Sequence, residues 1–268
     1  MKKSLAVFAV LAAVLVSSLG SVESFASDRG RELFTQAQVA FENRENSAEV
    51  ERTISLLAEA ERASADDEEL LYDVLVLSSR TLYWKGNHQK TDAEKMAVFE
   101  KGMEKAKAAY ALDDTLSEGY YFYAINLGKW GLAKGVLASL FRKGELIEHA
   151  ETSLKNETRS GEKGESLDGF GPNRTLGYLY YKLPGFAGGS TERALKYLSE
   201  ATAKAPSIAL NHVYYAEVLA SGNAADKARA RVILDNLLAQ NPATFNPSRV
   251  PETKEEFELA RKIRADLR

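Results

Sequence analysis

The sequence predicts an all-α protein in which antiparallel helical hairpins follow one another, and three observations carry this prediction. The six prolines of the 268 residues all lie after position 171, so nothing breaks a helical pattern in the first part of the chain. Apolar residues recur every three or four positions, and strand-like alternation is absent. Short runs of turn and capping residues separate segments of roughly 12 to 20 residues.

Amphipathic spacing identifies the helices in order. The first three apolar sets are Leu33, Ala37, Ala40 and Phe41; Val50, Ile54, Leu57 and Ala58; and Leu70, Leu71, Val74, Leu77, Ser78 and Leu82. Breaks are expected at 43–47, 64–67, 86–92, 113–117, 161–173, 184–190, 206–207, 221–224 and 241–248. A final charged helix at 252–267 carries an apolar face, which predicts that it caps the array. That face consists of Phe257, Ala260, Ile263 and Leu267.

An internal period supports stacked hairpins. Ala194 and the helix-ending Pro206 recur together 36 residues later, and a further copy ends at Asp114. Small alanines before a helix-ending proline are similar to the second helix of a tetratricopeptide repeat, whose period is about 34 residues. The interval of 92 residues between Asp114 and Pro206 requires two repeats plus an insertion. We expect the insertion at 156–173, as a surface loop, within a tetratricopeptide-like solenoid.

The first 26 residues have the composition of a secretory signal peptide. Two lysines precede an uncharged run at 4–22, and Ser24 and Ala26 supply small residues before a cleavage site. The strongly apolar part, 5–19, is short for a bilayer span, which disfavours the alternative of an uncleaved anchor. We therefore expect cleavage after Ala26, a bacterial periplasmic location, and a single domain over 27–268.

Composition argues against several classes of function. The absence of cysteine excludes a disulfide framework, a thiolate metal site and a cysteine nucleophile. A formal net charge of −3 gives no basic excess for a nucleic-acid partner. The histidines His88, His149 and His212 form no metal-binding pair, and no nucleophile motif is present. We expect no cofactor, no metal and no enzymatic activity.

The stretch 119–135 is unusually rich in aromatic residues. On a helix Tyr123, Asn126 and Trp130 share one face. The opposite, packing side is expected to hold Phe122, Ile125 and Leu132. Because the first helix of each hairpin usually lines the concave surface, the polar and aromatic face is a candidate for ligand contact. The alternative is that these aromatic side chains only fill gaps between helices.

A second candidate face lies on the helix expected at 173–184, where Arg174, Tyr178 and Tyr181 lie together. The glycine-rich stretch 185–190 could present amides to an anion, but no phosphate-loop motif surrounds it, which favours a turn that caps the next helix. The whole predicted binding surface comprises Tyr123, Asn126, Trp130, Arg174, Tyr178, Tyr181, Asn211 and Tyr215.

Motifs spread over 91–242 carry a resemblance to a known family. They are the stretch 121–130, the helix 176–180, the loop Leu183-Pro184-Gly185-Phe186 with Gly188-Gly189-Ser190, and the later Asn211, Ala216, Glu217 and Leu219. In this combination the chain resembles the TRAP-transporter-associated tetratricopeptide-repeat proteins, the T components, most specifically in the Leu-Pro-Gly-Phe loop. The resemblance implies a periplasmic homo-oligomer, a trimer, that works beside the solute-binding component of a TRAP-type importer. It also implies a pore or cavity for an apolar or acidic small ligand.

The sequence departs from the best-known members of that family, which are lipoproteins, because no cysteine follows its signal. Two functions remain open. In one, an accessory of a periplasmic import system binds a small organic ligand, with tyrosines on its apolar part and Arg174 on an acidic group. In the other, the groove binds a peptide or partner protein. Phe170 and Phe186 serve either an oligomer interface or packing between helices.

Overall fold

The computed structural model describes residues 28–135 and 140–267, and the all-α class predicted from the sequence is confirmed for them. The chain starts with a helix at 28–42 and continues through α2 (Ser47–Ala63), α3 (Glu68–Asn87), α4 (Asp92–Leu112), α5 (Ser117–Lys134) and α7 (Lys143–Lys155). It then forms η1 (Gly164–Ser166), α8 (Leu167–Lys182), η2 (Gly185–Ala187), α9 (Thr191–Lys204), α10 (Ala209–Ala220), α11 (Ala224–Leu238), α12 (Pro242–Phe245), η3 (Pro247–Arg249) and α13 (Val250–Asp266). The predicted signal peptide, 1–26, lies outside the described residues.

Side-chain caps fix several helix starts at the breaks that the sequence predicts. Asn46 before α2, Thr91 before α4 and Asn223 before α11 each accept a hydrogen bond from a backbone N–H of the first turn. The carboxylate of Glu94 bonds back to the backbone of Thr91, which completes a capping box. These local bonds satisfy amides that a helix leaves free, so the boundaries are encoded in the sequence nearby.

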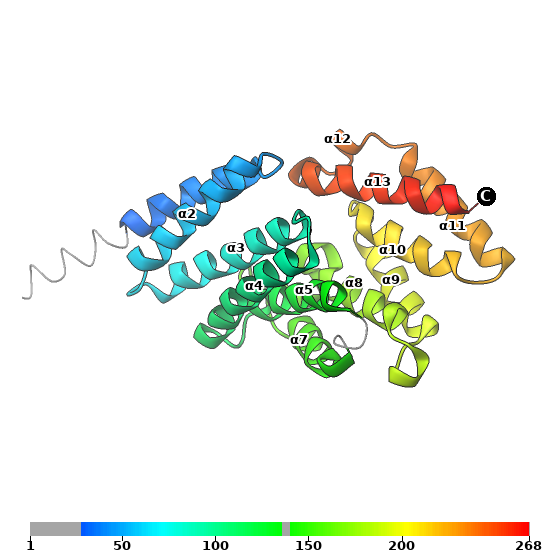
Figure 1. Cartoon of the computed structure of the whole chain (residues 1–268), viewed down its shortest axis with the longest axis horizontal. Helices are drawn as coiled ribbons and strands as arrows, with labels where there is room; N and C mark the ends of the chain where they lie inside the picture. Colours follow the sequence, from blue (N-terminus) through cyan, green and yellow to red (C-terminus); the bar gives the residue numbers. More distant parts are fainter. Residues whose placement is uncertain (1–27, 136–139, 268) are drawn as a thin grey trace, which may run out of the picture.

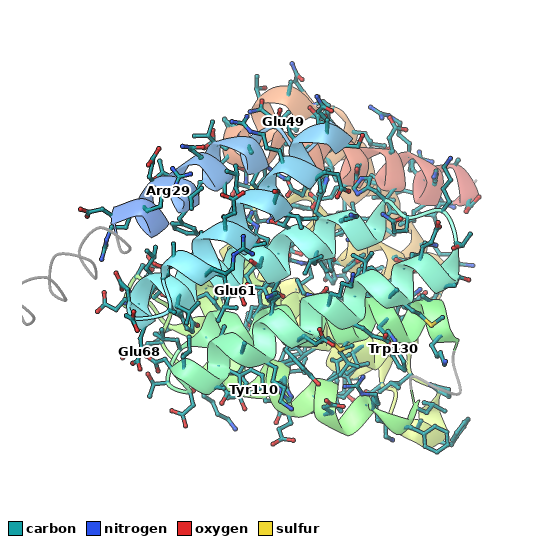
Figure 2. All side chains as sticks on the ribbon, turned by 60° about the vertical axis from the view of Figure 1, so that its left-hand side comes forward. Arg29, Glu49, Glu61, Glu68, Tyr110 and Trp130 are labelled. Carbon is teal, nitrogen blue, oxygen red and sulfur yellow. The ribbon has the colours of Figure 1, made fainter. Side chains whose placement is uncertain are left out.

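Each helix packs mainly against its neighbours in the sequence, and the helices together form a curved array (Figure 1). Glu68, at the start of α3, and Tyr110, near the end of α4, lie at the same edge, so these helices run antiparallel (Figure 2). The contacts use small residues that are fully buried, which allows close approach of the axes. They include Ala60, Ala106, Ala150, Ala194, Ala201 and Ala230.

The expectation of a surface loop at 156–173 is wrong for its second half. Gly171, Pro172 and Asn173 are buried in α8. Before them, residues 168–170 adopt left-handed φ values of 50°, 62° and 61°. Asp168 and Phe170 are not glycines, so this conformation is strained and must be held by contacts from elsewhere in the fold.

The charged helix predicted at the C-terminus is present as α13, and it does more than cap the array. Its Phe257 and Ala260 are fully buried in a cluster with residues of α10 and α11. Its first turn reaches back to the N-terminal hairpin, where Arg44 forms an ion pair with Glu252. Helix α13 therefore connects the two ends of the curved array (Figure 1).

Candidate functional site

The inner side of the array holds a cavity of about 580 Å³. Its walls come from the helix at 28–42, α3, α5, α8, α10 and α13, with the first turn of α7. Within the described chain, α2, α4, α9 and α11 contribute no residue to this lining. The volume lies in the range of pockets that hold small organic molecules.

Helical spacing explains how single helices supply a whole wall. On α3 the cavity residues are Arg80, Tyr83, Trp84 and Asn87; on α5 they include Ile125, Lys129 and Leu132; on α8 they include Arg174, Tyr178, Leu179 and Lys182. Residues three and four positions apart project from the same face of a helix. Helices α3 and α8 therefore each present one main stripe to the cavity, whereas α5 contributes residues from most of its circumference between Tyr121 and Leu132.

Apolar and aromatic side chains make up most of the lining. Besides the residues named above, they include Phe41, Phe122, Leu127, Trp130, Leu146, Leu183, Leu210, Tyr214 and Leu259. The rings of Tyr178 and Tyr214 stack with their centroids 3.8 Å apart, which joins α8 to α10. Burial raises the pKa of both phenols, so these groups are neutral at physiological pH.

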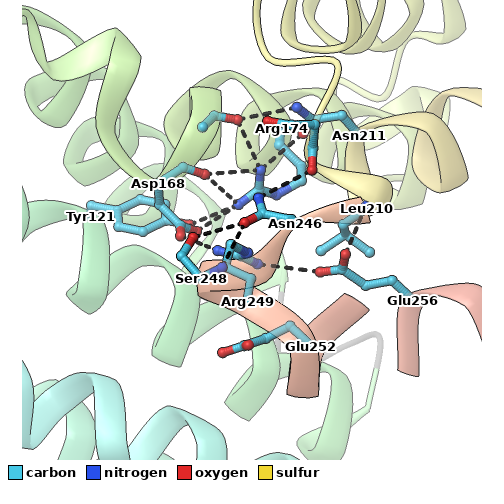
Figure 3. A network of polar contacts seen from close by, with 12 residues as sticks. Tyr121, Asp168, Arg174, Leu210, Asn211, Asn246, Ser248, Arg249, Glu252 and Glu256 are labelled. Atoms are coloured by element: carbon cyan, nitrogen blue, oxygen red, sulfur yellow. Dashed lines mark hydrogen bonds and ion pairs between the residues drawn. The ribbon is translucent and has the colours of Figure 1, made fainter. Parts of the chain in front are cut away.

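One end of the cavity is closed by a polar network around Asp168 (Figure 3). The Asp168 carboxylate accepts hydrogen bonds from Tyr121 Oη at 2.6 Å and from Arg174 at 2.7 Å, and it also pairs with Arg249. Burial would raise the pKa of Asp168, but Arg249, Arg174 and Arg80 together hold it well below its usual range. Asp168 is therefore ionised, and its contacts hold the left-handed turn at 168–170, within the first turn of α8.

The same network connects α8 to α10 and α13. Arg174 donates to Asn211 Oδ1 at 2.9 Å, and Arg249 lies 3.3 Å from a carboxylate oxygen of Glu256. The other oxygen of Glu256 accepts from the backbone N–H of Leu210 at 3.1 Å. Arg174 is buried, the Arg249 side chain is 12% exposed, and each has a carboxylate partner, so they hold elements together and are not available to a ligand in this arrangement.

The structure places three of the eight predicted site residues, Trp130, Arg174 and Tyr178, in the cavity lining. Tyr123 and Asn126 lie between helices instead: Tyr123 donates to Glu145 on α7, and Asn126 Nδ2 donates to Ser79 on α3 at 3.1 Å. The expected packing side of α5 faces the opposite way, because its residues line the cavity. These are Phe122, Ile125 and Leu132.

The remaining predicted residues also lie outside the lining. Tyr181 packs against a hydrophobic cluster that joins α8 and α9, and Asn211 is fully buried in the polar network. Tyr215 accepts a hydrogen bond from Arg229 on α11 at 2.8 Å. Asn211 thus holds Arg174 in place without lining the cavity, while Tyr181 and Tyr215 do not contact the cavity.

Neither α3 nor the N-terminal half of α13 was assigned to the site from the sequence. The α3 stripe places Arg80 beside the aromatic Tyr83 and Trp84, and that contrast was the available signal. For α13 no local signal exists, since its N-terminal half reaches the cavity only because the array curves. Among residues 28–135 and 140–267, no group of His, Asp and Glu side chains is placed to hold a metal ion.

The fold and the cavity define a class: an all-helical protein with a mainly apolar internal site. No protein-family model matches the chain, and no curated protein matches its sequence. In the described part of the chain, no helix has the length and apolar character needed to cross a membrane.

Proposed function

We propose that the chain is a periplasmic protein of tetratricopeptide-like architecture that binds a small, mainly apolar organic ligand and serves a TRAP-type solute importer. The observation that carries the proposal is the cavity of about 580 Å³ on the inner side of the array, lined mostly by apolar and aromatic side chains. The importer and the periplasmic location rest on the sequence resemblance and on the signal-like first 26 residues.

The order of helices around the cavity supports a solenoid of hairpins. The first helix, α3, α5, α8 and α10 all contribute to the lining. Of the described helices that follow them, α2, α4, α9 and α11 contribute no residue, and α7 contributes only its first turn. In stacked helical hairpins the first helices form the concave side and the second helices form the outer side. This alternation agrees with the repeat found in the sequence.

A small ligand is favoured over a peptide because α13 lies across the concave side. Arg44 and His88, from the N-terminal part, pair with Glu252 and Glu255 of α13. A scaffold that binds a peptide needs an open groove along its concave face. With both ends of the array joined, the interior suits a compact molecule better than an extended chain.

The loop that carries the resemblance supports a role in docking the solute-binding component. Phe186, within η2, is 88% exposed, and Lys143 Nζ donates to the neighbouring carbonyl of Ala187 at 2.5 Å, which attaches the loop to α7. Large apolar side chains at an exposed position are typical of protein contact sites. We propose this loop as the contact with the solute-binding protein.

Both tryptophans of the chain, Trp84 and Trp130, line the cavity and make fluorescence a direct test. We expect native mass spectrometry of the mature protein, purified from periplasm, to show a trimer that retains a small molecule. Titration of the ligand-free protein with that molecule should change tryptophan fluorescence. Ligand binding would be refuted if the purified protein retained no small molecule and if its fluorescence did not respond to a library of apolar organic acids and alcohols.

A pull-down tests the importer. We expect the wild type to recover a solute-binding protein. The Phe186→Ser variant should lose this recovery, and the Val232→Ser control should keep it. Val232 is also exposed but lies on α11, away from the η2 loop. Equal recovery by both variants would contradict docking at Phe186.

A further inference from the structure

We propose that Arg80 and Lys129 are the anion-binding groups of the cavity, here called the anion subsite, which selects organic anions with an apolar body over neutral molecules of the same shape. The inference rests on the ligand-binding function proposed above and specifies the chemistry of the ligand. Its basis is that some charged side chains of the lining have partners within the protein and others do not.

Every carboxylate in the described lining has a cationic partner within the protein. The pairs are Asp168 with Arg174 and Arg249, Glu252 with Arg44, Glu255 with His88, and Glu256 with Arg249. No acidic group of the lining is therefore left to bind a cationic ligand. A positively charged ligand would have to displace one of these pairs.

The basic residues of the lining are not balanced in the same way. Five have partners: Arg174 and Arg249 as above, Arg142 with Glu145, Lys182 with Glu217, and Lys143 with the carbonyl of Ala187. In the described chain, Arg80 and Lys129 make neither a hydrogen bond nor an ion pair; each instead lies over a ring. Arg80 lies 5.1 Å from the centroid of Phe41, and Lys129 lies 5.8 Å from that of Tyr83.

Both groups are cations in a mainly apolar enclosure. Burial lowers the pKa of Arg80, opposed by the more distant Asp168 and Glu252, but arginine remains protonated throughout the physiological range. The Tyr83 hydroxyl, opposed by burial, raises the pKa of Lys129, so this amine is also protonated. Both side chains are only partly exposed, and a partly buried cation without a direct partner gains from an anion that a ligand supplies.

The surroundings of the two cations define the rest of the ligand. Arg80 shares its helical face with Tyr83 and Trp84, and Lys129 lies between Ile125 and Leu132 on α5. These neighbours offer apolar contact. The carboxylates that act on the two cations from further away already have cationic partners of their own: Asp168 with Arg174 and Arg249, Glu252 with Arg44, and Glu255 with His88. The guanidinium fork suits a carboxylate or a phosphate monoester, so the ligand is an amphiphile whose anionic head is one of these two groups.

Binding of matched amphiphiles to the full mature chain tests the proposal. Straight-chain carboxylates from hexanoate to palmitate, the corresponding monoalkyl phosphates and the corresponding alcohols would each be titrated while tryptophan fluorescence is followed. Anions should bind at least tenfold more tightly than the alcohol of equal length, since a hydrogen bond to a charged group contributes at least that factor. The better of the two anion series identifies the head group.

Variants locate the subsite. Arg80→Met and Lys129→Met should each weaken anion binding about tenfold or more and leave the alcohols unchanged. Lys182→Met is the matched control, because Lys182 also lines the cavity but is paired with Glu217. Arg80 acts on Asp168 only at a distance, and Lys129 forms no direct pair in the described chain, so each variant should lower the melting temperature of the ligand-free protein by less than about 4 °C.

The outcomes separate this inference from the function on which it rests. Alcohols that bind as tightly as anions, or anion binding that survives both variants, would overturn the anion subsite while ligand binding in the cavity still holds. If neither anions nor alcohols bind at any chain length, both proposals fail. A marked loss of thermal stability in Arg80→Met would assign the arginine a structural role instead.

Discussion

The polar network predicts that Asp168 contributes more to stability than any exposed ion pair. Asp168→Asn keeps the shape of the side chain and tolerates a left-handed conformation, but it leaves Arg174 and Arg249 without their shared counter-charge. Removing one partner of a buried ion pair costs about 3–5 kcal/mol. For a chain of this size that loss lowers the melting temperature by about 10 °C. The control Glu45→Gln, which breaks the exposed pair with Lys254, should change stability by less than about 1 kcal/mol.

Urea unfolding followed by far-UV circular dichroism measures the loss, and pH adds a second readout. The folded pKa of Asp168 is depressed below the unfolded value of about 3.9. The contribution of Asp168 to folding stability is therefore fully present above about pH 4 and is lost as the pH falls through the folded pKa. The unfolding free energies of wild type and variant should converge in acid. Adding Arg174→Met to Asp168→Asn should cost less than the sum of the single changes, since it removes one uncompensated cation. A variant as stable as Glu45→Gln at neutral pH would refute this reasoning.

Three further predictions follow from other contacts. Gly177→Ala should lower the free energy of unfolding in urea by about 1–3 kcal/mol, because the added Cβ would lie 2.6 Å from Leu198 Cγ. The control Gly185→Ala, whose Cβ would have no neighbour within 4 Å, should be neutral, and equal stability of the two variants would contradict the close packing of α8 on α9. The hydrogen bond to Glu255 raises the pKa of His88, so the contribution of His88 to folding stability is fully present below about pH 6.5 and is lost as the pH rises through the folded pKa. An NMR titration should show a raised His88 pKa in the wild type and an ordinary one in Glu255→Gln. Arg44→Met, which removes the ion-pair partner of Glu252, should lower the free energy of unfolding by about 3 kcal/mol and speed amide exchange in the first turn of α13, whereas Lys254→Met should change neither. Unchanged exchange in Arg44→Met would show that the Arg44 pair does not hold α13 in place.

Part of the candidate site was predictable from the sequence. Trp130, Arg174 and Tyr178 were expected to face a ligand, and they line the cavity. Their helices and approximate faces follow from spacing and composition. On α5 the cavity also takes Phe122, Ile125 and Leu132 from the side assigned to packing, because both sides of this helix carry aromatic and apolar residues. On such a helix the period shows that stripes exist but does not show which stripe meets another helix.

The sequence alone determined that this chain is helical and approximately where its helices begin and end, because periodicity, capping and turn residues act within a few positions of one another. Tertiary structure alone decided which faces enclose the cavity and that α13 joins the N-terminal hairpin. It also paired Asp168 with Arg249, 81 positions away, and left Arg80 and Lys129 without partners in the described chain. Pairing of charges depends on distances across the fold, and residues that meet only when the array curves leave no local pattern in the sequence.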